Sequence, residues 1–434
     1  MRVIFTGHTG VCKSDVLRTL ITEVAERDFH TENLKRTDVK KFIASYSVEK
    51  EIESILEGPI TPFLEKFTQE NRNTIWRAAF RKVLEKVNND SPSHALLEFH
   101  NLFLRNGNFF SCVDWDLVMQ FRPTIIITLI DDIYDVWQRV NDREKKLKTD
   151  SYFELSEILS WRTAEITAAE TLAKNLFVNP ETHSITPEIL RELQSSQFRR
   201  LAQLLGKALP HFVFAVKHPI SSLYQLLFRR DVLTLYTAFP ITATRHDSKR
   251  VHEINSFRKV LHENFTVFDP VTIDELRFEK TKFDKGSLEL TQRWDICTEW
   301  YTSIIQETSI SENPFKNIAP RKLLTDIKAQ LVARDIRLVC QSRCLCGYRP
   351  FYGAREYISS GMDAELRVAN EEMKHVAVFH PKEDRTEKNS NILINFAEKA
   401  RLFEEVSEVI DHLNKVQAKH KEIFNGEDRP LTWE

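Results

Sequence analysis

Short apolar runs alternate with stretches of helical spacing throughout the first half of the chain. Residues 2–6 form an apolar run, and beyond Ser14 apolar side chains recur every three or four positions. Such spacing indicates an amphipathic helix, whereas a short apolar run bounded by polar residues favours a buried strand. Further strands are predicted at residues 42–45, 95–99, 124–130 and 212–216. Strands that alternate with helices predict a parallel α/β sheet.

The same alternation starts again near residue 220. Strands are predicted at residues 232–236, 267–268 and 375–379, a helix at 323–331, and further apolar runs at 336–340 and 344–346. After a polar stretch at 382–391, apolar side chains at helical spacing predict an amphipathic helix. They are Phe396, Leu402, Phe403, Val406, Val409, Ile410 and Leu413. This apolar stripe is expected either to pack on its own domain or to form a contact in a homo-oligomer.

The length of the chain favours two domains. A single hydrophobic core stops growing at about 250–300 residues, and the chain has 434. We place one α/β domain at residues 1–222, a second at 223–385, and a C-terminal amphipathic helix and tail at 386–434.

The charged residues nearly cancel, with 61 Lys and Arg against 63 Asp and Glu. Because the chain has almost no net charge, no nucleic-acid partner is expected. No apolar run reaches the ~18 residues that span a bilayer, so we expect no membrane partner and a cytoplasmic location. Six cysteines without a secretory signal favour reduced thiols. Cys340, Cys344 and Cys346 lack a second ligand pair at zinc-site spacing, which favours structural thiols over a metal site.

The loop between the first strand and the first helix has the residues of a phosphate site. Gly7, Gly10, Lys13 and Ser14 follow the pattern G-x-x-x-x-G-K-[ST], except that Cys12 stands in place of the last glycine. In this pattern the loop N–H groups bind phosphate, the lysine reaches the outer phosphates, and the serine hydroxyl ligates Mg²⁺. A side chain at position 12 is expected to weaken phosphate transfer more than binding. The alternative is an ordinary strand-to-helix turn.

Two carboxylates follow the apolar run at residues 124–130. Ligands of open α/β sheets bind at the carboxyl ends of strands, so Asp131 is a candidate Mg²⁺ ligand. Asp132 is a candidate for the same role or for a helix cap.

Further motifs follow the loop in order along the first half. They are Glu98-Phe99-His100, Asn106-Gly107-Asn108-Phe109-Phe110, the run at 124–130, Arg139 and Arg143, and Trp161-Arg162-Thr163-Ala164-Glu165-Ile166. With them the first half resembles the nucleoside monophosphate kinases, especially the archaeal type of adenylate kinase. The resemblance implies a P-loop kinase-like domain that uses ATP with Mg²⁺. It also implies that Arg139, Arg143 and Arg162 close over the phosphates, although solvated helix positions explain them equally well. His100 fits either a place near the acceptor or a core position.

A second motif lies between the last predicted strands, at Ser359, Gly361 and Glu365. Gly361 permits a tight entry into the next helix, and Glu365 falls in the first turns of that helix. A carboxylate there can attack an anomeric carbon, while Ser359 and the helix N-terminus can hold a phosphate. A surface glutamate on a helix is the alternative.

Residues 230–382 resemble the nucleoside 2-deoxyribosyltransferase superfamily, which includes deoxynucleoside monophosphate N-glycosidases. The resemblance rests on S-x-G-x-x-x-E at Ser359 to Glu365 and on the strand and loop that end near Arg245. It implies a flavodoxin-like α/β domain with Glu365 as nucleophile and Ser359 as phosphate ligand. It also implies that the loop Phe239, Pro240, Ile241 and Thr242 surrounds the sugar and base. Where many members carry an Asp, this chain has Gln341-Ser342-Arg343, so a second catalytic carboxylate is either absent or supplied by Asp335 or Asp363.

Together these features predict a bifunctional nucleotide enzyme. An ATP-binding kinase-like domain would be joined to a domain that cleaves or transfers at the N-glycosidic bond of a nucleotide. The alternatives are a nucleotide-sensing protein whose sites bind without turnover, a nucleoside monophosphate kinase with a non-catalytic second domain, and an NAD hydrolase.

Overall fold

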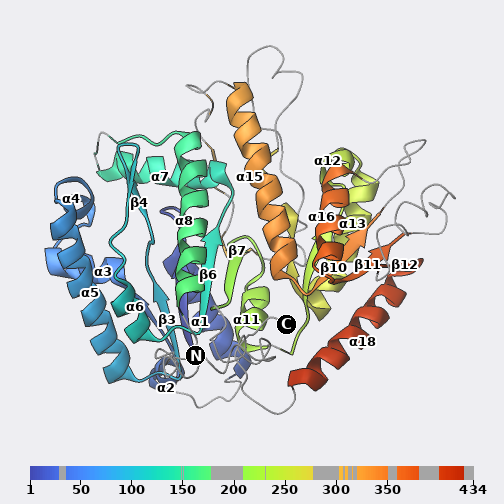
Figure 1. The fold of residues 1–434 in the computed structure, drawn as a ribbon, viewed down its shortest axis with the longest axis horizontal. Helices are drawn as coiled ribbons and strands as arrows, with labels where there is room; N and C mark the ends of the chain where they lie inside the picture. Colours follow the sequence, from blue (N-terminus) through green and yellow to red (C-terminus); the bar gives the residue numbers. More distant parts are fainter. Residues whose placement is uncertain are drawn as a thin grey trace, which may run out of the picture.

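The computed structural model describes residues 1–28, 36–147, 149, 151–176, 209–229, 231–276, 303–305, 308–310, 315, 320–349, 359–380 and 400–424. Within them the chain forms two parallel five-stranded sheets that are covered by helices (Figure 1). The predicted parallel α/β architecture is therefore confirmed.

The first sheet has the strand order β2-β3-β1-β6-β7, with every neighbouring pair parallel. Its strands are β1 (Arg2–Thr6), β2 (Ile43–Ser47), β3 (His94–Glu98), β6 (Ile125–Ile130) and β7 (His211–Ala215). All six residues of β6 are buried, as expected for a strand that is covered on both faces. Because β3, β1 and β6 are neighbours, the loops after these three strands meet at one edge of the sheet.

Helices and one hairpin surround this sheet. The helices are α1 (Lys13–Asp28), α2 (Arg36–Phe42), α3 (Val48–Leu56), α4 (Thr61–Glu65), α5 (Gln69–Asp90), α6 (Trp115–Phe121), α7 (Ile133–Leu147), α8 (Leu155–Asn175) and α11 (Ile220–Phe228). The antiparallel hairpin joins β4 (Phe103–Arg105) to β5 (Asn108–Phe110).

The second sheet has the order β12-β11-β10-β8-β9 and is also parallel. Its strands are β8 (Thr234–Ala238), β9 (Thr266–Phe268), β10 (Cys344–Tyr348), β11 (His375–Phe379) and β12 (Ala400–Phe403). The associated helices are α12 (Ile241–Thr244), α13 (Ser248–Asn264), the short 3₁₀ helix η2 (Pro270–Thr272), α15 (Pro320–Gln341), α16 (Ser360–Glu371) and α18 (Val406–Phe424).

Two apolar stretches of the second half differ from expectation. Residues 336–340 belong to the long helix α15 rather than forming a separate apolar run before β10. Leu402 and Phe403, expected in a helix, lie in β12 and pair with Val378 and Phe379 of β11. The helix starts at Val406, while Phe396 and the polar stretch 382–391 lie outside the described residues.

The C-terminal segment belongs to the second sheet. β12 is the edge strand of this sheet, and α18 packs on β11. Val409 and Leu413 of α18 are fully buried in the same core as Leu235 and Phe257. The apolar stripe of α18 therefore packs on its own domain, which was one of the two expected arrangements.

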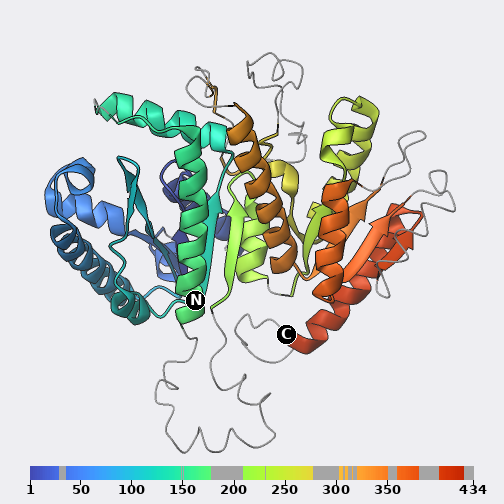
Figure 2. The same ribbon diagram turned by 45° about the horizontal axis from the view of Figure 1, so that its top comes forward.

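The two sheets share one hydrophobic core. A continuous cluster of buried side chains includes Phe5 and Phe214 of the first sheet and Tyr236 and Leu345 of the second. Helix α15 lies beside α8 between the sheets in both views (Figures 1 and 2). At its end the Gln341 amide donates to Val213 O at 2.8 Å and accepts from Val213 N at 3.0 Å. This side chain thus occupies the backbone groups of edge strand β7.

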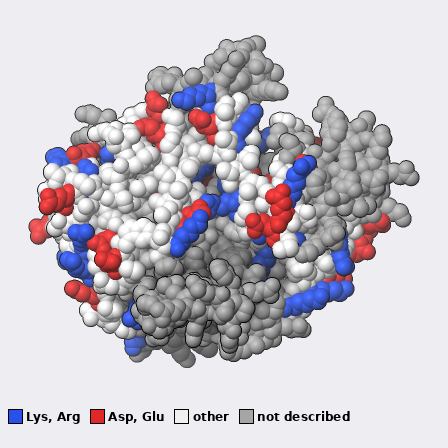
Figure 3. Space-filling view, viewed as in Figure 1, with Lys and Arg blue, Asp and Glu red and all other residues white. Residues whose placement is uncertain are grey.

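The surface of the protein carries charges of both signs. Positive and negative side chains are interspersed on the face shown in Figure 3. Among the described helices, none combines the length and apolarity needed to cross a bilayer.

Cys344 and Cys346 are buried in β10, and burial raises the pKa of Cys344 to about 12. Such a thiol stays protonated, which disfavours metal ligation.

Candidate functional site

The loop from β1 to α1 has a backbone that requires glycine at two positions. Gly7 has a φ of 136° and Gly10 a φ of 91°. A Cβ at Gly7 would lie 2.6 Å from Leu129 O, and one at Gly10 would lie 2.8 Å from a methyl group of Val140. Cys12 has a φ of 57°, also in the left-handed region. The position where the phosphate-loop pattern has its last glycine therefore keeps a glycine-like backbone here, although a cysteine occupies it.

Lys13 is held at the centre of this loop. Its Nζ donates to Gly7 O at 2.6 Å and to His100 Nε2 at 2.8 Å. His100 Nδ1 in turn lies 2.7 Å from Glu49 Oε1. Burial lowers the pKa of His100 to about 4, so the imidazole is neutral and its Nδ1–H donates to Glu49. The chain Lys13, His100 and Glu49 thus connects the loop to α3.

Ser14 contacts a carboxylate from the neighbouring strand. Its Oγ donates to Glu98 Oε1 at 2.6 Å. Glu98 Oε2 is buried and makes no hydrogen bond of normal geometry among the described residues. Burial raises the pKa of Glu98, and the nearby hydroxyls of Ser14 and Ser47 partly oppose this rise. In P-loop proteins the loop hydroxyl and a carboxylate at a strand end hold Mg²⁺. A hydroxyl beside a buried oxygen without a partner fits an Mg²⁺ ion, whose binding would satisfy Oε2.

Asp131, the sequence-based candidate for the metal, has other partners. Its carboxylate forms ion pairs with Arg139 and, at 3.0 Å, with Lys217, and it is fully buried. Two cations therefore already neutralise it, and the carboxylate beside Ser14 is Glu98 instead. Asp132 Oδ1 accepts from Tyr134 N at 2.9 Å, which is the capping role that was its alternative.

The three candidate arginines have different environments. Arg143 lines the loop cavity. Arg139 pairs with Asp131, and its Nη1 lies 3.4 Å from Cys12 Sγ at the edge of the loop. Arg162 is buried, and its guanidinium pairs with Glu275 and Gln330 of the second half. Of the three, Arg143 is the one that reaches the cavity.

These residues surround a cavity of about 300 Å³. Its lining comes from the loop, α1, α3, the end of β3 and α7. The lining residues are His8, Thr9, Gly10, Cys12, Lys13, Ser14, Asp15, Ser47, Glu49, Lys50, Glu53, Glu98, His100 and Arg143. The cavity therefore combines the loop lysine and serine with four carboxylates, a second lysine and an arginine.

A second buried carboxylate fixes the loop from α8. Glu165 accepts from Gly7 N at 3.2 Å, Asn101 N at 2.8 Å and Leu102 N at 2.9 Å. Burial raises its pKa to about 7. Sequence reasoning gave Glu98 and Glu165 no site role, although both lie in the quoted motifs. The pairing of β3 with β1, which sets Glu98 opposite Phe5, is the signal that points to Glu98.

In the second half, Glu365 lies in a buried polar cluster. Tyr236 Oη of β8 donates to Glu365 Oε1 at 2.7 Å. Asp335 of α15 accepts from Arg334 Nη2 at 2.7 Å. Burial and the negative charge of Asp335 raise the pKa of Glu365 well above its usual range, and burial also raises that of Asp335. Two carboxylates with raised pKa values next to a tyrosine are the kind of arrangement found at acid–base sites.

The other candidates of this half have structural roles. Ser359 caps α16, because its Oγ accepts from Met362 N at 3.2 Å. Gly361 lies in the first turn of α16, where a Cβ would meet nothing within 4 Å, so no tight entry demands glycine. Asp363 pairs with Arg367 on an exposed helix face, which leaves Asp335 as the carboxylate near Glu365.

The predicted sugar and base loop begins where β8 ends. Phe239 is buried in the core of the second sheet, and Pro240 and Ile241 are half-buried at the start of α12. The side chain of Thr242 and the segment 350–358 before the Glu365 motif lie outside the described residues.

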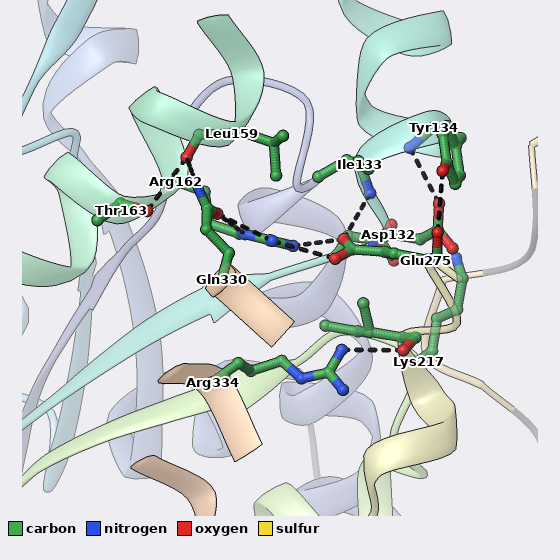
Figure 4. Close-up of polar contacts among 12 residues, drawn as sticks. Asp132, Ile133, Tyr134, Leu159, Arg162, Thr163, Lys217, Glu275, Gln330 and Arg334 are labelled. Carbon is green, nitrogen blue, oxygen red and sulfur yellow. Dashed lines mark hydrogen bonds and ion pairs between the residues drawn. The ribbon is translucent and has the colours of Figure 1, made fainter. Parts of the chain in front are cut away.

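The two halves meet in a buried network around Glu275 (Figure 4). Glu275 accepts from Ile133 N at 3.1 Å, at the start of α7, and from Arg162 Nη2 at 3.1 Å. Tyr134 Oη donates to the Glu275 carbonyl at 2.9 Å. Gln330 donates to Leu159 O at 2.8 Å. A carboxylate of the second half therefore contacts the N-terminus of the helix that carries Arg139 and Arg143.

No protein-family model and no curated protein matches the sequence. Two solved structures are weakly similar. Shikimate kinase from Bacteroides thetaiotaomicron is 9% identical, with a TM-score of 0.26 over 52% of this chain and 98% of that chain. A proposed UDP-N-acetylglucosamine 2-epimerase from Listeria monocytogenes is 10% identical, with a TM-score of 0.20 over 100% of this chain and 99% of that one. TM-scores this low show no shared fold, so the function is argued from the site alone.

Proposed function

We propose that the chain is a bifunctional nucleotide enzyme. Its first half binds ATP with Mg²⁺ in the cavity at Lys13 and Ser14, as in a P-loop kinase. Its second half acts on the N-glycosidic bond of a nucleotide at Glu365. The observation that carries the proposal is the contact of Ser14 Oγ with Glu98 at 2.6 Å, beside a buried carboxylate oxygen that lacks a partner.

The residues of the first half divide the task of binding ATP. The N–H groups of the loop and of the first turn of α1 bind the phosphates. Ser14 and Glu98 would hold the Mg²⁺, which would neutralise developing charge on the phosphates. Lys13 Nζ donates to Gly7 O at 2.6 Å and to His100 Nε2 at 2.8 Å, which leaves one of its three N–H groups for a phosphate. Arg143 also lines this cavity, and we assign it the contact with the outermost phosphate.

Calorimetry tests this half directly. Wild-type protein is expected to bind ATP with Mg²⁺, and Lys13→Ala is expected to lose at least about 1.5–3 kcal/mol of binding, the usual contribution of a hydrogen bond to a charged group. Equal ATP affinity of the two proteins would overturn the phosphate site.

Three observations support the activity of the second half. Glu365 and Asp335 form a carboxylate pair, and Tyr236 orients Glu365 through its hydroxyl. The strand order, in which β8 lies between β9 and β10, equals the flavodoxin-like order 2-1-3-4-5. A glutamate that forms a covalent glycosyl intermediate needs a second group to protonate the leaving base. In this cluster Asp335, whose pKa is raised by burial, is the proposed donor of that proton.

Release of a free base tests this half. The protein is incubated with a panel of nucleoside and deoxynucleoside monophosphates and NAD, with and without ATP and Mg²⁺. Base or nicotinamide release that Glu365→Gln abolishes supports the proposal, and the substrate that reacts separates a nucleotide glycosidase from an NAD hydrolase. No release from any substrate contradicts it.

A sensor is the second candidate, favoured by the state of the loop. Cys12 carries a side chain at a positive φ, and Lys13 is bonded to Gly7 O and His100. Binding of ATP that Lys13→Ala abolishes, with no product after hours of incubation, would favour sensing. Formation of a diphosphate that survives Glu365→Gln would instead favour a kinase with a non-catalytic second half.

A further inference from the structure

A second cavity of about 250 Å³ adjoins the loop cavity. We propose that this second cavity, called here the acceptor cavity, binds an uncharged polyhydroxylated molecule, a sugar or a nucleoside, rather than a phosphorylated one. The inference rests on the proposed binding of ATP by the first half, and it specifies what receives the phosphate.

The two cavities meet where phosphate transfer would take place. Thr9, Glu49, Glu53, His100 and Arg143 line both of them. A phosphate held by the loop would therefore point at a molecule in the acceptor cavity across these shared residues. The remaining wall is apolar on one side, with Ile60, Leu64 and Phe103, and Thr61 adds a hydroxyl.

The charges of the acceptor cavity disfavour a second phosphate. Glu49 and Glu53 are one helical turn apart on α3, so both carboxylates lie on the same face of the helix. Glu49 and Glu53 also line the loop cavity, but there Lys13 and Lys50 offset their charge. In the acceptor cavity Arg143 is the one cation among the described lining residues. A phosphate on the acceptor would add about two negative charges next to two carboxylates. Hydroxyl groups instead donate hydrogen bonds to carboxylates without this repulsion.

Glu49 is positioned to take the proton of such a hydroxyl. His100 donates to Glu49 Oε1 through its backbone N at 2.8 Å and its ring Nδ1 at 2.7 Å. Burial alone would raise the pKa of Glu49, but His100 and Lys13 outweigh it and lower the pKa, so the carboxylate is ionised at neutral pH. Both of these hydrogen bonds end on Oε1 of the carboxylate.

Phosphate transfer from ATP to the acceptor hydroxyl can be completed with these groups. The acceptor oxygen forms a bond to the γ-phosphorus of ATP, and the bond from that phosphorus to the β–γ bridging oxygen breaks. The bridging oxygen keeps the electron pair and leaves on ADP. The hydroxyl proton passes to Glu49, the role that a catalytic-loop carboxylate has in protein kinases.

Paired acceptors test the proposal with the full-length protein. Ribose, glucose and adenosine are each compared with ribose 5-phosphate, glucose 6-phosphate and AMP, using γ-labelled ATP with Mg²⁺. The unphosphorylated member of at least one pair is expected to be labelled with a kcat/KM about ten-fold higher or more. Labelling of adenosine alone identifies a nucleoside acceptor, and labelling of a free sugar identifies a sugar.

Equal or better use of the phosphorylated members overturns the proposal. If no acceptor is labelled, calorimetry with a non-hydrolysable ATP analogue measures binding of the same pairs. Absence of binding by all six, in a protein that still binds ATP through Lys13, overturns the acceptor proposal and leaves the ATP site standing. Loss of ATP binding itself would instead overturn the proposed function.

A charge reversal in the acceptor cavity provides a second test. Glu53 is exposed on α3, so Glu53→Arg is expected to fold and to lower the preference for the unphosphorylated acceptor about ten-fold. Glu65→Arg is the matched control, because Glu65 is equally exposed at the end of α4 but does not line the cavity. An unchanged preference in Glu53→Arg, or an equal change in both variants, contradicts the assignment.

Discussion

Cys12 combines a side chain with a backbone conformation that suits glycine. At a φ of 57° a residue with a Cβ lies in the left-handed region, at a cost of roughly 1–2 kcal/mol. Its thiol contacts Gly10 O at 3.8 Å and Arg139 at 3.4 Å, and neither weak contact offsets that cost. The strained residue lies at the point where the loop would receive phosphate, as strained residues at functional sites often do.

Replacing Cys12 separates the backbone from the thiol. Cys12→Gly is expected to raise the free energy of unfolding by up to about 1 kcal/mol, because relief of strain exceeds the added chain entropy. Cys12→Ala keeps the Cβ and is expected to show no gain. Urea unfolding of both variants measures this. A gain of equal size in Cys12→Ala would show that the thiol, rather than the Cβ, is responsible.

Glu165 makes the stability of the loop depend on pH. Its pKa rises from 4.5 in the unfolded chain to about 7 in the folded protein, so the folded state binds the proton more tightly. The energetic cost of burying the ionised Glu165 carboxylate is therefore absent below pH 4.5 and complete above pH 7. The unfolding free energy of wild type minus that of Glu165→Gln should therefore fall on the order of 3 kcal/mol as the pH rises through this window. A difference in unfolding free energy, measured with urea, that does not change with pH would contradict this prediction.

The local sequence pattern brings the loop residues together but does not identify the side chains that contact them. Gly7, Gly10, Lys13 and Ser14 lie within eight positions of one another, so a pattern along the chain places them together. Glu98 and Glu165 reach the loop through strand pairing and helix packing across more than 80 residues. Asp131 ends a buried strand as expected, yet Lys217, from a strand end far along the chain, neutralises it.

Among the helices, α16 has a start that the local sequence explains most clearly. Ser359 satisfies a free N–H group at the start of the helix. Ser359→Ala is expected to lower the free energy of unfolding by about 1 kcal/mol, while Ser359→Asn largely keeps it. If Ser359 also holds a 5'-phosphate, Ser359→Ala further weakens binding of nucleoside monophosphates, which calorimetry measures separately. A stability unchanged in the alanine variant would exclude the cap.

Element boundaries show what apolar runs can and cannot predict. Most strands were predicted within two residues because buried parallel strands read as short apolar runs. The run at 336–340 is apolar like those strands, but it continues a helix that begins at Pro320. Leu402 and Phe403 follow a helical spacing but form an edge strand, because pairing with β11 is a long-range contact. Periodicity alone does not distinguish these cases.

Across the whole molecule, Glu275 connects the second half to the proposed nucleotide site of the first. It is fully buried, and its carboxylate contacts Arg162 and the N-terminus of α7. Glu275→Gln is expected to destabilise the protein by about 3–5 kcal/mol, since it leaves a buried guanidinium unpaired. At temperatures where the variant is folded, it is also expected to weaken ATP binding, because α7 carries Arg143.

A second ion pair across the same helices supplies the control. Glu170 of α8 pairs with Arg337 of α15, and both side chains are about one-third exposed. Glu170→Gln is expected to cost less than about 1 kcal/mol and to leave ATP affinity unchanged. Equal ATP affinity in Glu275→Gln and wild type would show that the interface only stabilises the fold.

The most direct test of the account is the Mg²⁺ dependence of ATP binding in Glu98→Gln. Calorimetry with and without Mg²⁺ compares it with wild type and with Asp15→Asn, a carboxylate change in the same cavity that leaves the Ser14–Glu98 contact intact. The account predicts that Mg²⁺ tightens ATP binding in wild type and Asp15→Asn, and that this gain disappears in Glu98→Gln. The same gain in all three proteins would contradict a magnesium–nucleotide site at Ser14 and Glu98.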